Sequence, residues 1–249
     1  MTPSRLLAAL EWSAMTALPV VTACAVVGIV IAVIAQTGVG VKFAGAIVAL
    51  GGGKMIFTLI FAMIASLVLG LGLPTTPNYI IAAALTAPAL VQFGLPAIAA
   101  HFFVFYYGIL ADITPPTAIA PYAVASIAQA DPNRTCISAC MIALSGLIVP
   151  FVFAYQPAML DPMLRLPGST LSAFIAVSLS AAVGVIMLSA ALIGYLRCVA
   201  TVAERIVLAA GALLLIAPVR MTDVAGAALV VAVVALQTLR MRRSVKVAS

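Results

Sequence analysis

The stretch Gly70-Leu-Gly-Leu-Pro-Thr-Thr-Pro77 interrupts an apolar part of the sequence and decides the kind of fold that the chain predicts. The apolar runs on either side, residues 55–71 and 78–93, are both compatible with helices. Two prolines three positions apart remove two backbone donors, and two glycines loosen the turn before them. The stretch therefore predicts a break in a helix, and an ordinary loop between two spans is the alternative interpretation.

The composition indicates where such a break lies. Of the 249 residues, 65% are hydrophobic and 7% are charged, and the mean hydropathy is +1.30. A soluble domain is about half apolar and about a quarter charged. The net charge of +6 comes from basic residues that apolar runs separate, so it predicts no nucleic-acid binding. These values exclude a soluble globule and a disordered chain, and they predict an all-α polytopic membrane protein.

Several runs are long enough, or nearly so, to cross a bilayer, which takes about 20 apolar residues. They are residues 13–35, 55–71, 136–155, 169–196, 204–218 and 224–239. The first run contains Val21-Thr-Ala-Cys24, which resembles a lipoprotein cleavage site. The run is about twice as long as the core of a signal peptide, so we predict a membrane span and not a cleaved signal.

The sequence changes in composition near Gly168. Prolines and glycines break the apolar runs before this point, and the runs after it are plainer. We therefore predict two domains, residues 1–168 and residues 169–249. The positive-inside rule places the basic tail, residues 240–246, in the cytoplasm.

A second break follows an aromatic-rich run at residues 97–110. The sequence Ala111-Asp-Ile-Thr-Pro-Pro116 separates this run from a short apolar piece at residues 117–128. Neither piece is long enough to span comfortably. Irregular backbone at membrane depth needs surrounding protein or a water-filled cavity. The two pieces therefore predict a re-entrant hairpin with its tip at the two prolines.

Both breaks offer oxygen atoms to an ion. A broken helix exposes carbonyl groups at the end of one half and N–H groups at the start of the next, which suit cations and anions respectively. The neutral side-chain oxygens belong to Thr75, Thr76, Asn78 and Thr114. Such oxygens suit a hard cation such as Na⁺. Asp112 is either a direct ligand of an ion or proton or a cap on the following helix, and both interpretations stay open.

The sequence predicts no enzyme. An intramembrane aspartyl protease needs two aspartates at membrane depth, and only Asp112 qualifies. A single histidine excludes the HExxH zinc motif, and the four cysteines lack metal-ligand spacing. No nucleophile elbow surrounds Ser66, and we expect His101 to be a hydrogen-bonded packing residue. We expect no catalytic residue, no cofactor and no metal besides Na⁺.

The two breaks also carry a resemblance to a known family. Two segments, Gly70-Leu-Gly-Leu-Pro-Thr-Thr-Pro-Asn-Tyr-Ile-Ile81 and Phe105-Tyr-Tyr-Gly-Ile-Leu-Ala-Asp-Ile-Thr-Pro-Pro116, closely resemble the large permease subunit of TRAP (tripartite ATP-independent periplasmic) transporters. The nearest likeness is to fused permeases, in which the small and large subunits form one chain served by a TAXI-type solute receptor. The resemblance covers about residues 1–165, and residues 169–240 look like the helical extension of some fused members.

The resemblance implies a sodium-driven symporter of the bacterial inner membrane that takes up carboxylate-bearing organic solutes from a periplasmic receptor. It implies the second inverted repeat of an elevator-type transporter, with a re-entrant hairpin and a broken helix, followed by about three further transmembrane helices. On this pattern one Na⁺ would be held by Gly70, Gly72, Thr75, Thr76, Ile113 and Thr114. The solute cavity would involve Pro74, Asn78, Asp112, Pro115 and Pro116.

The chain departs from the family pattern in two ways. The small subunit and the first repeat are absent, so we expect a truncated or split product whose partner supplies the rest. The family's second hairpin enters from the periplasm, which is opposite to the orientation that the basic tail predicts. The expected partners are a TAXI-type receptor, the small subunit, the missing repeat and the lipid bilayer. A non-transporting accessory or assembly subunit stays open as the alternative function.

Overall fold

The apolar runs form helices in the structure, a computed structural model that describes residues 2–115, 117–155, 157–160, 171–216 and 220–248. Every regular element in these ranges is helical, apart from one isolated bridge between Tyr195 and Val199. The predicted all-α class is therefore confirmed. The helices long and apolar enough to cross a membrane, among the described residues, are Pro3–Thr37, Pro132–Tyr155, Phe174–Ile193 and Thr222–Arg240.

The chain forms two compact units, residues 1–120 and residues 121–249. The domain boundary predicted at residue 168 lies outside the described residues. The helix α7 (Ile119–Ala128) runs across the limit between the two units. Each unit is considered by itself below.

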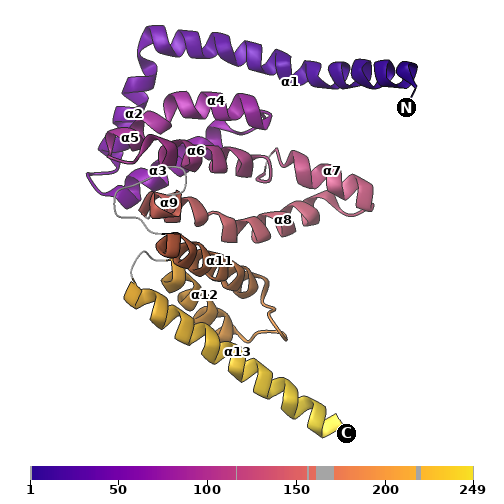
Figure 1. Cartoon of the computed structure of the whole chain (residues 1–249), viewed down its shortest axis with the longest axis vertical. Coiled ribbons are helices and arrows are strands. Elements are labelled where there is room, and N and C mark those ends of the chain that lie inside the picture. Colours follow the sequence, from indigo (N-terminus) through magenta and orange to yellow (C-terminus); the bar gives the residue numbers. More distant parts are fainter. Residues whose placement is uncertain (1, 116, 156, 161–170, 217–219, 249) are drawn as a thin grey trace. The chain divides into compact units, whose positions relative to one another are not determined.

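The predicted break lies in the first unit. It contains α1 (Pro3–Thr37), α2 (Val39–Leu50), α3 (Met55–Leu69), α4 (Thr75–Leu85), α5 (Ala87–Gln92) and α6 (Ala97–Ala111). The helices α3, α4 and α6 pack against one another, and α1 contacts α4 and α2 (Figure 1). Their core includes the fully buried side chains of Leu59, Leu90, Phe103 and Tyr107. The two ends of the break, Gly70 and Pro77, are buried against this core, whereas Leu71, Gly72 and Pro74 between them are exposed.

Two helix predictions in this unit need correction. The run at residues 55–71 was expected to span, but α3 has only 15 residues. The run at residues 78–93 forms two helices separated at Thr86, and the first begins earlier than expected, at Thr75. Pro77 therefore lies inside the first turn of α4. A helix tolerates proline there because the N–H groups of its first turn have no partner within the helix.

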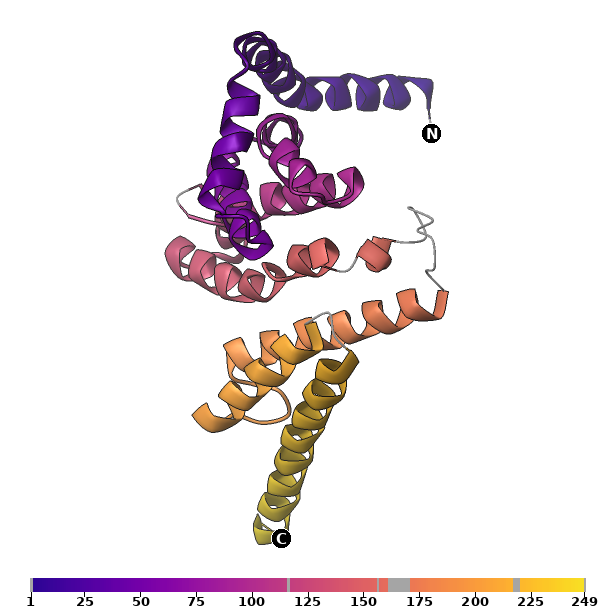
Figure 2. The ribbon, with the colours of Figure 1, turned by 90° about the vertical axis from the view of Figure 1, so that its left-hand side faces the viewer.

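The second unit is built around the helix α11 (Leu171–Ile193). It contacts α8 (Pro132–Gly146), α9 (Val149–Tyr155) and η1 (Pro157–Leu160) as well as α12 (Val202–Ile216). The last helix, α13 (Arg220–Ala248), packs on α12, and both views show the two side by side (Figure 1, Figure 2). The helix α8 begins at Pro132, four residues before the predicted span, because Asp131 caps it. The carboxylate of Asp131 accepts a hydrogen bond of 2.8 Å from the backbone N–H of Arg134.

Glycines allow the helices of the second unit to approach closely. A Cβ atom at Gly226 of α13 would lie 2.7 Å from the carbonyl oxygen of Gly211 in α12. A Cβ atom at Gly184 of α11 would lie 2.7 Å from Cγ1 of Ile216. Membrane helices associate largely through such packing of small residues.

A polar motif fixes the start of α12. The backbone N–H of Thr201 donates to Oε2 of Glu204 at 2.8 Å, and the backbone N–H of Glu204 donates to Oγ1 of Thr201 at 3.4 Å. This reciprocal pair is a capping box, which satisfies two donors at the start of a helix. The hydrogen bond from the Thr201 backbone, together with weaker contributions from Gln237 and Arg240, lowers the pKa of Glu204 below its ordinary value of 4.5.

We expect Gly226→Ala to lower the free energy of unfolding by about 1–3 kcal/mol, because the new methyl group would overlap the Gly211 carbonyl. Denaturant titration of the detergent-purified chain, followed by circular dichroism, measures this loss. Gly28→Ala is the matched control, since no atom lies within 4 Å of the added Cβ. An equal loss in both variants would contradict the close contact of α12 and α13.

Glu204 predicts a pH dependence of stability. A carboxylate whose pKa is lowered by folding stabilises the protein above its unfolded pKa, and this stabilisation is lost as the pH falls through the folded pKa. We expect the melting temperature of the wild-type chain to fall more steeply than that of Glu204→Gln as the pH drops below 4.5. Parallel melting curves for the two proteins would contradict the role given to the carboxylate.

Candidate functional site

The first predicted break is present in the structure, and it is shorter than the sequence suggested. The helix α3 ends at Leu69, the chain turns through residues 70–74, and α4 begins at Thr75. Gly72 adopts a φ angle of +80°, which favours glycine because a side chain would be strained there. The two halves of the helix are thus separated by only five residues.

Asn78 joins the two sides of the break to α6. Its Nδ2 donates a hydrogen bond of 2.8 Å to the carbonyl oxygen of Gly108, and its side chain is completely buried. A Cβ atom at Gly70 would lie 2.5 Å from both Nδ2 of Asn78 and Cβ of Ala111. Only glycine at position 70 allows this approach, so the end of α3, the start of α4 and the end of α6 converge on one amide.

The second break begins as a series of tight turns after α6. The backbone N–H groups of Asp112, Ile113 and Thr114 donate to the carbonyls three residues earlier, at 3.1–3.2 Å. The hydroxyl of Thr114 also donates to the Ala111 carbonyl, at 3.0 Å. Pro115 is exposed, and Pro116, the predicted hairpin tip, lies outside the described residues. Asp112 directly follows Ala111, so it lies next to the place where α3, α4 and α6 meet at Asn78.

Four buried side-chain oxygens near the two breaks have no hydrogen-bond partner among the described residues. They are Oγ of Ser66, Oδ1 of Asn78, Oδ1 of Asp112 and Oγ1 of Thr117. Ser66 lies one helical turn before Gly70, and the Thr117 methyl lies 3.6 Å from the position of a Cβ at Gly72. Buried oxygens without a partner are costly and need an explanation. Oxygen atoms of this kind are the ligands that hard cations use.

Ser66 and Thr117 were not among the predicted ion ligands. Ser66 was considered only as a nucleophile, although it lies four residues before Gly70 and therefore one helical turn before the break. Thr117 follows the two prolines directly. These two spacings are the signals in the sequence that could have identified them.

The other predicted site residues differ in exposure. Thr75 is partly buried at the start of α4, whereas Thr76 and Gly72 are exposed. Ile113, Thr114 and Asp112 are partly buried, and Pro74 is exposed. No side chain among the described residues caps α4, so the backbone N–H groups of its first turn keep their donor capacity. The assignment of these residues to an ion site and a solute cavity stays a prediction.

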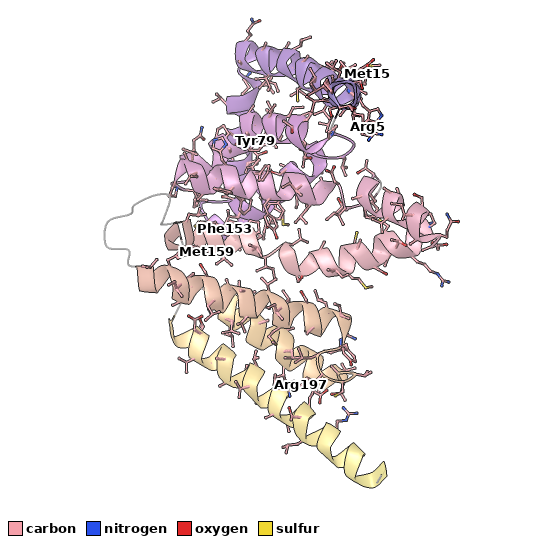
Figure 3. The ribbon with its side chains drawn as sticks, turned by 45° about the vertical axis from the view of Figure 1, so that its right-hand side comes forward. Arg5, Met15, Tyr79, Phe153, Met159 and Arg197 are labelled. Atoms are coloured by element: carbon pink, nitrogen blue, oxygen red, sulfur yellow. The ribbon has the colours of Figure 1, made fainter. Side chains whose placement is uncertain are left out.

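His101 is a hydrogen-bonded packing residue, as predicted. Its Nδ1 lies 3.0 Å from the hydroxyl of Tyr79, which is labelled in Figure 3. The Tyr79 ring also packs edge-to-face on Phe105, with 5.3 Å between ring centroids. These contacts of Tyr79 join α4 to α6 at a second place, in addition to the hydrogen bond of Asn78.

We expect Asn78→Ala to lower the free energy of unfolding by about 1–3 kcal/mol, because the buried carbonyl of Gly108 loses its donor. The comparison is made in potassium buffer, so that sodium binding does not contribute. Asn133→Ala serves as the control: Asn133 is exposed in the first turn of α8, and a change of less than about 0.5 kcal/mol is expected. An equal loss of stability in both variants would contradict the role of Asn78 as the clamp, by which we mean its hydrogen bond to the Gly108 carbonyl.

Comparison with known proteins gives one match. The family model described as "Tripartite ATP-independent periplasmic transporter, DctM component" matches residues 1–164, which include both breaks. No curated protein and no solved structure matches the chain.

Proposed function

The chain belongs to the family of the tripartite ATP-independent periplasmic transporter, DctM component, and on this premise we propose that it couples the import of carboxylate-bearing organic solutes to a sodium gradient. Membership makes the chain an integral membrane component of a transporter, from a family of permeases and not of enzymes. The sodium ion, the solute class and the dependence on a receptor are the content of the proposal.

The unpaired oxygens near Asn78 carry the sodium part of the proposal. Three of them are neutral and one belongs to the carboxyl group of Asp112. The carbonyls of Ser66 and Val68 at the end of α3 already accept from the backbone N–H groups of Gly70 and Leu71, so the side-chain oxygens are the ligands that we propose. A small cation held by these groups would satisfy atoms that are otherwise buried without a partner. The hydroxyls of Thr75 and Thr114 lie at the edges of the same region and would complete the set of ligands.

The start of α4 supports the solute part. Its first-turn N–H groups lack a side-chain cap within the described residues, and the helix dipole makes this end partly positive. In transporters with broken helices, such an end faces an anionic solute while carbonyls bind the cation. A carboxylate at Thr75 and Thr76 would use these donors.

The clamp at Asn78 offers a way to couple the two ligands. Because α3, α4 and α6 meet at this side chain, a cation between the breaks would order both the end of α6 and the start of α4. The solute would then bind to a helix start that the cation has already positioned. Binding in this order is positive coupling, because each ligand lowers the ordering cost of the other.

Partners form the remaining part of the proposal. The family implies a periplasmic receptor and a small permease subunit in general. We further propose that the receptor is of the TAXI type, that a first inverted repeat completes the transport unit, and that the assembly moves as an elevator in the bacterial inner membrane. The second break would then act as the re-entrant hairpin.

Sodium binding can be tested without knowing the solute. We expect NaCl to raise the melting temperature of the detergent-purified chain above its value in KCl, because a ligand that binds only the folded state stabilises it. Asp112→Asn and Thr114→Ala should raise the sodium concentration needed for half of this effect, by about tenfold for Asp112→Asn.

Thr86→Ala is the matched control for this experiment. The Thr86 hydroxyl is also buried without a partner among the described residues, but it lies at the opposite end of α4, about 16 Å from Thr75. Its sodium response should equal that of the wild-type chain. A wild-type chain with no difference between NaCl and KCl would overturn the sodium proposal and favour a non-transporting accessory subunit.

A further inference from the structure

A polar cluster lies at one end of the second unit, outside the residues that match the family. It is formed by the loop between α11 and α12, the first turn of α12 and the segment of α13 around residue 238. We call it the arginine cap, and its described members are Arg197, Glu204, Arg205, Gln237, Thr238 and Arg240. The inference below does not depend on the transport proposal.

The arginine cap is ordered by a buried amide. Gln237 is completely buried, although it lies in a segment apolar enough to cross a membrane. Its Oε1 accepts from the backbone N–H of Arg197 at 3.3 Å, and its Nε2 donates to Oε2 of Glu204 at 3.4 Å. The loop is therefore held against α13, and its position does not depend on an exposed contact.

Arg197 presents its guanidinium on this ordered loop. The side chain, labelled in Figure 3, is exposed, and its Nη1 donates to Oγ1 of Thr238 at 3.1 Å. A guanidinium has five N–H donors in a planar fork. Among the described residues, one acceptor is bonded to this fork, so most of its donors remain for a further acceptor such as a ligand.

The other two arginines of the cap differ in availability. Arg205 donates from Nε to the Ala191 carbonyl and from Nη2 to the Leu192 carbonyl, both at 2.8 Å. It therefore serves the end of α11. Arg240 is 55% exposed and lies 3.9 Å from the Glu204 carboxylate. Arg197 thus keeps the most donors outside its described contacts, Arg240 carries an exposed charge paired with Glu204, and Arg205 supports the end of α11.

The charge of this end is strongly positive. The sequence adds Arg242, Arg243 and Lys246 beyond Arg240 on α13. Three basic residues whose side chains are described, Arg197, Arg205 and Arg240, therefore stand against one acid, Glu204, and the sequence that follows is basic as well. The spans Phe174–Ile193 and Thr222–Arg240 both end here, which is the level at which lipid headgroups lie. At the opposite end of α13, where Arg220 and Asp223 offset each other in charge, Asp223 accepts a 3.1 Å hydrogen bond from the hydroxyl of Ser180.

We propose that the arginine cap binds the phosphodiester headgroup of an anionic phospholipid, with Arg197 and Arg240 as the contacting residues. A planar guanidinium pairs with two phosphate oxygens at once, which a lysine ammonium cannot do in the same geometry. Basic residues beside the end of a membrane helix attract anionic lipid. The loop adds a hydrogen-bond donor in a fixed position, the guanidinium of Arg197. The cap would hold the second unit at a negatively charged lipid surface.

The test uses the full chain in detergent and native mass spectrometry. Phosphatidylglycerol is the anionic probe, and phosphatidylethanolamine is the zwitterionic comparison. We expect the wild-type chain to retain phosphatidylglycerol preferentially, Arg197→Gln to bind it about fivefold more weakly, and Arg197→Lys to recover only part of this loss. Excess inorganic phosphate should not displace the lipid.

Arg134→Gln is the matched control, because it removes one exposed arginine of the same unit outside the cap. It should change lipid retention less than about twofold. Unchanged retention in Arg197→Gln, an equal loss in Arg134→Gln, or displacement by phosphate would each overturn the proposal. If circular dichroism shows that Arg197→Gln does not fold, Arg240→Gln, with a largely exposed side chain, replaces it under the same criteria.

Discussion

The backbone of a helix that breaks within an apolar environment must find partners in the protein, and the first unit depends on how it meets this requirement. The interior of a bilayer offers no water to an unpaired backbone group, so each such group there costs several kcal/mol. The Asn78 amide supplies one donor to the last turn of α6, and Gly70 lets the broken helix come close enough for it to do so. Four buried side-chain oxygens near the two breaks are unpaired within the described part of the chain, which makes this region suited to a ligand and not only to packing.

The class of the protein and the position of the break could be predicted from the sequence, because both depend on local composition. The glycines and prolines between Gly70 and Pro77 predict a break wherever the neighbouring helices lie. The start of α4 could not be placed so well. Pro77 was counted as part of the break, whereas a proline in a first turn is compatible with a helix, and Thr75 and Thr76 are helical.

The composition of the candidate site was harder to predict, because its contacts join residues far apart in the sequence. Asn78 and Gly108 are separated by 30 positions, and no local pattern pairs them. The same reason explains why Gln237 was not singled out. A glutamine in an apolar run could face any neighbour, and only the packing of α12 on α13 shows that it meets Arg197 and Glu204. The resemblance identified the region of the site, while Ser66 and Thr117 required the structure.

The length of α1 has a consequence for the membrane around the protein. Its 35 residues make a helix about 52 Å long, and the hydrocarbon core of a bilayer is about 30 Å thick. Only 6% of its most apolar window is buried in the protein, so lipid or another chain must cover most of its surface. A mismatch of this size is relieved by tilting the helix or by leaving its first turns, with Arg5, Glu11 and Trp12, among the headgroups. The angle of α1 is thereby linked to bilayer thickness, and membranes of different lipid chain length will hold this helix differently.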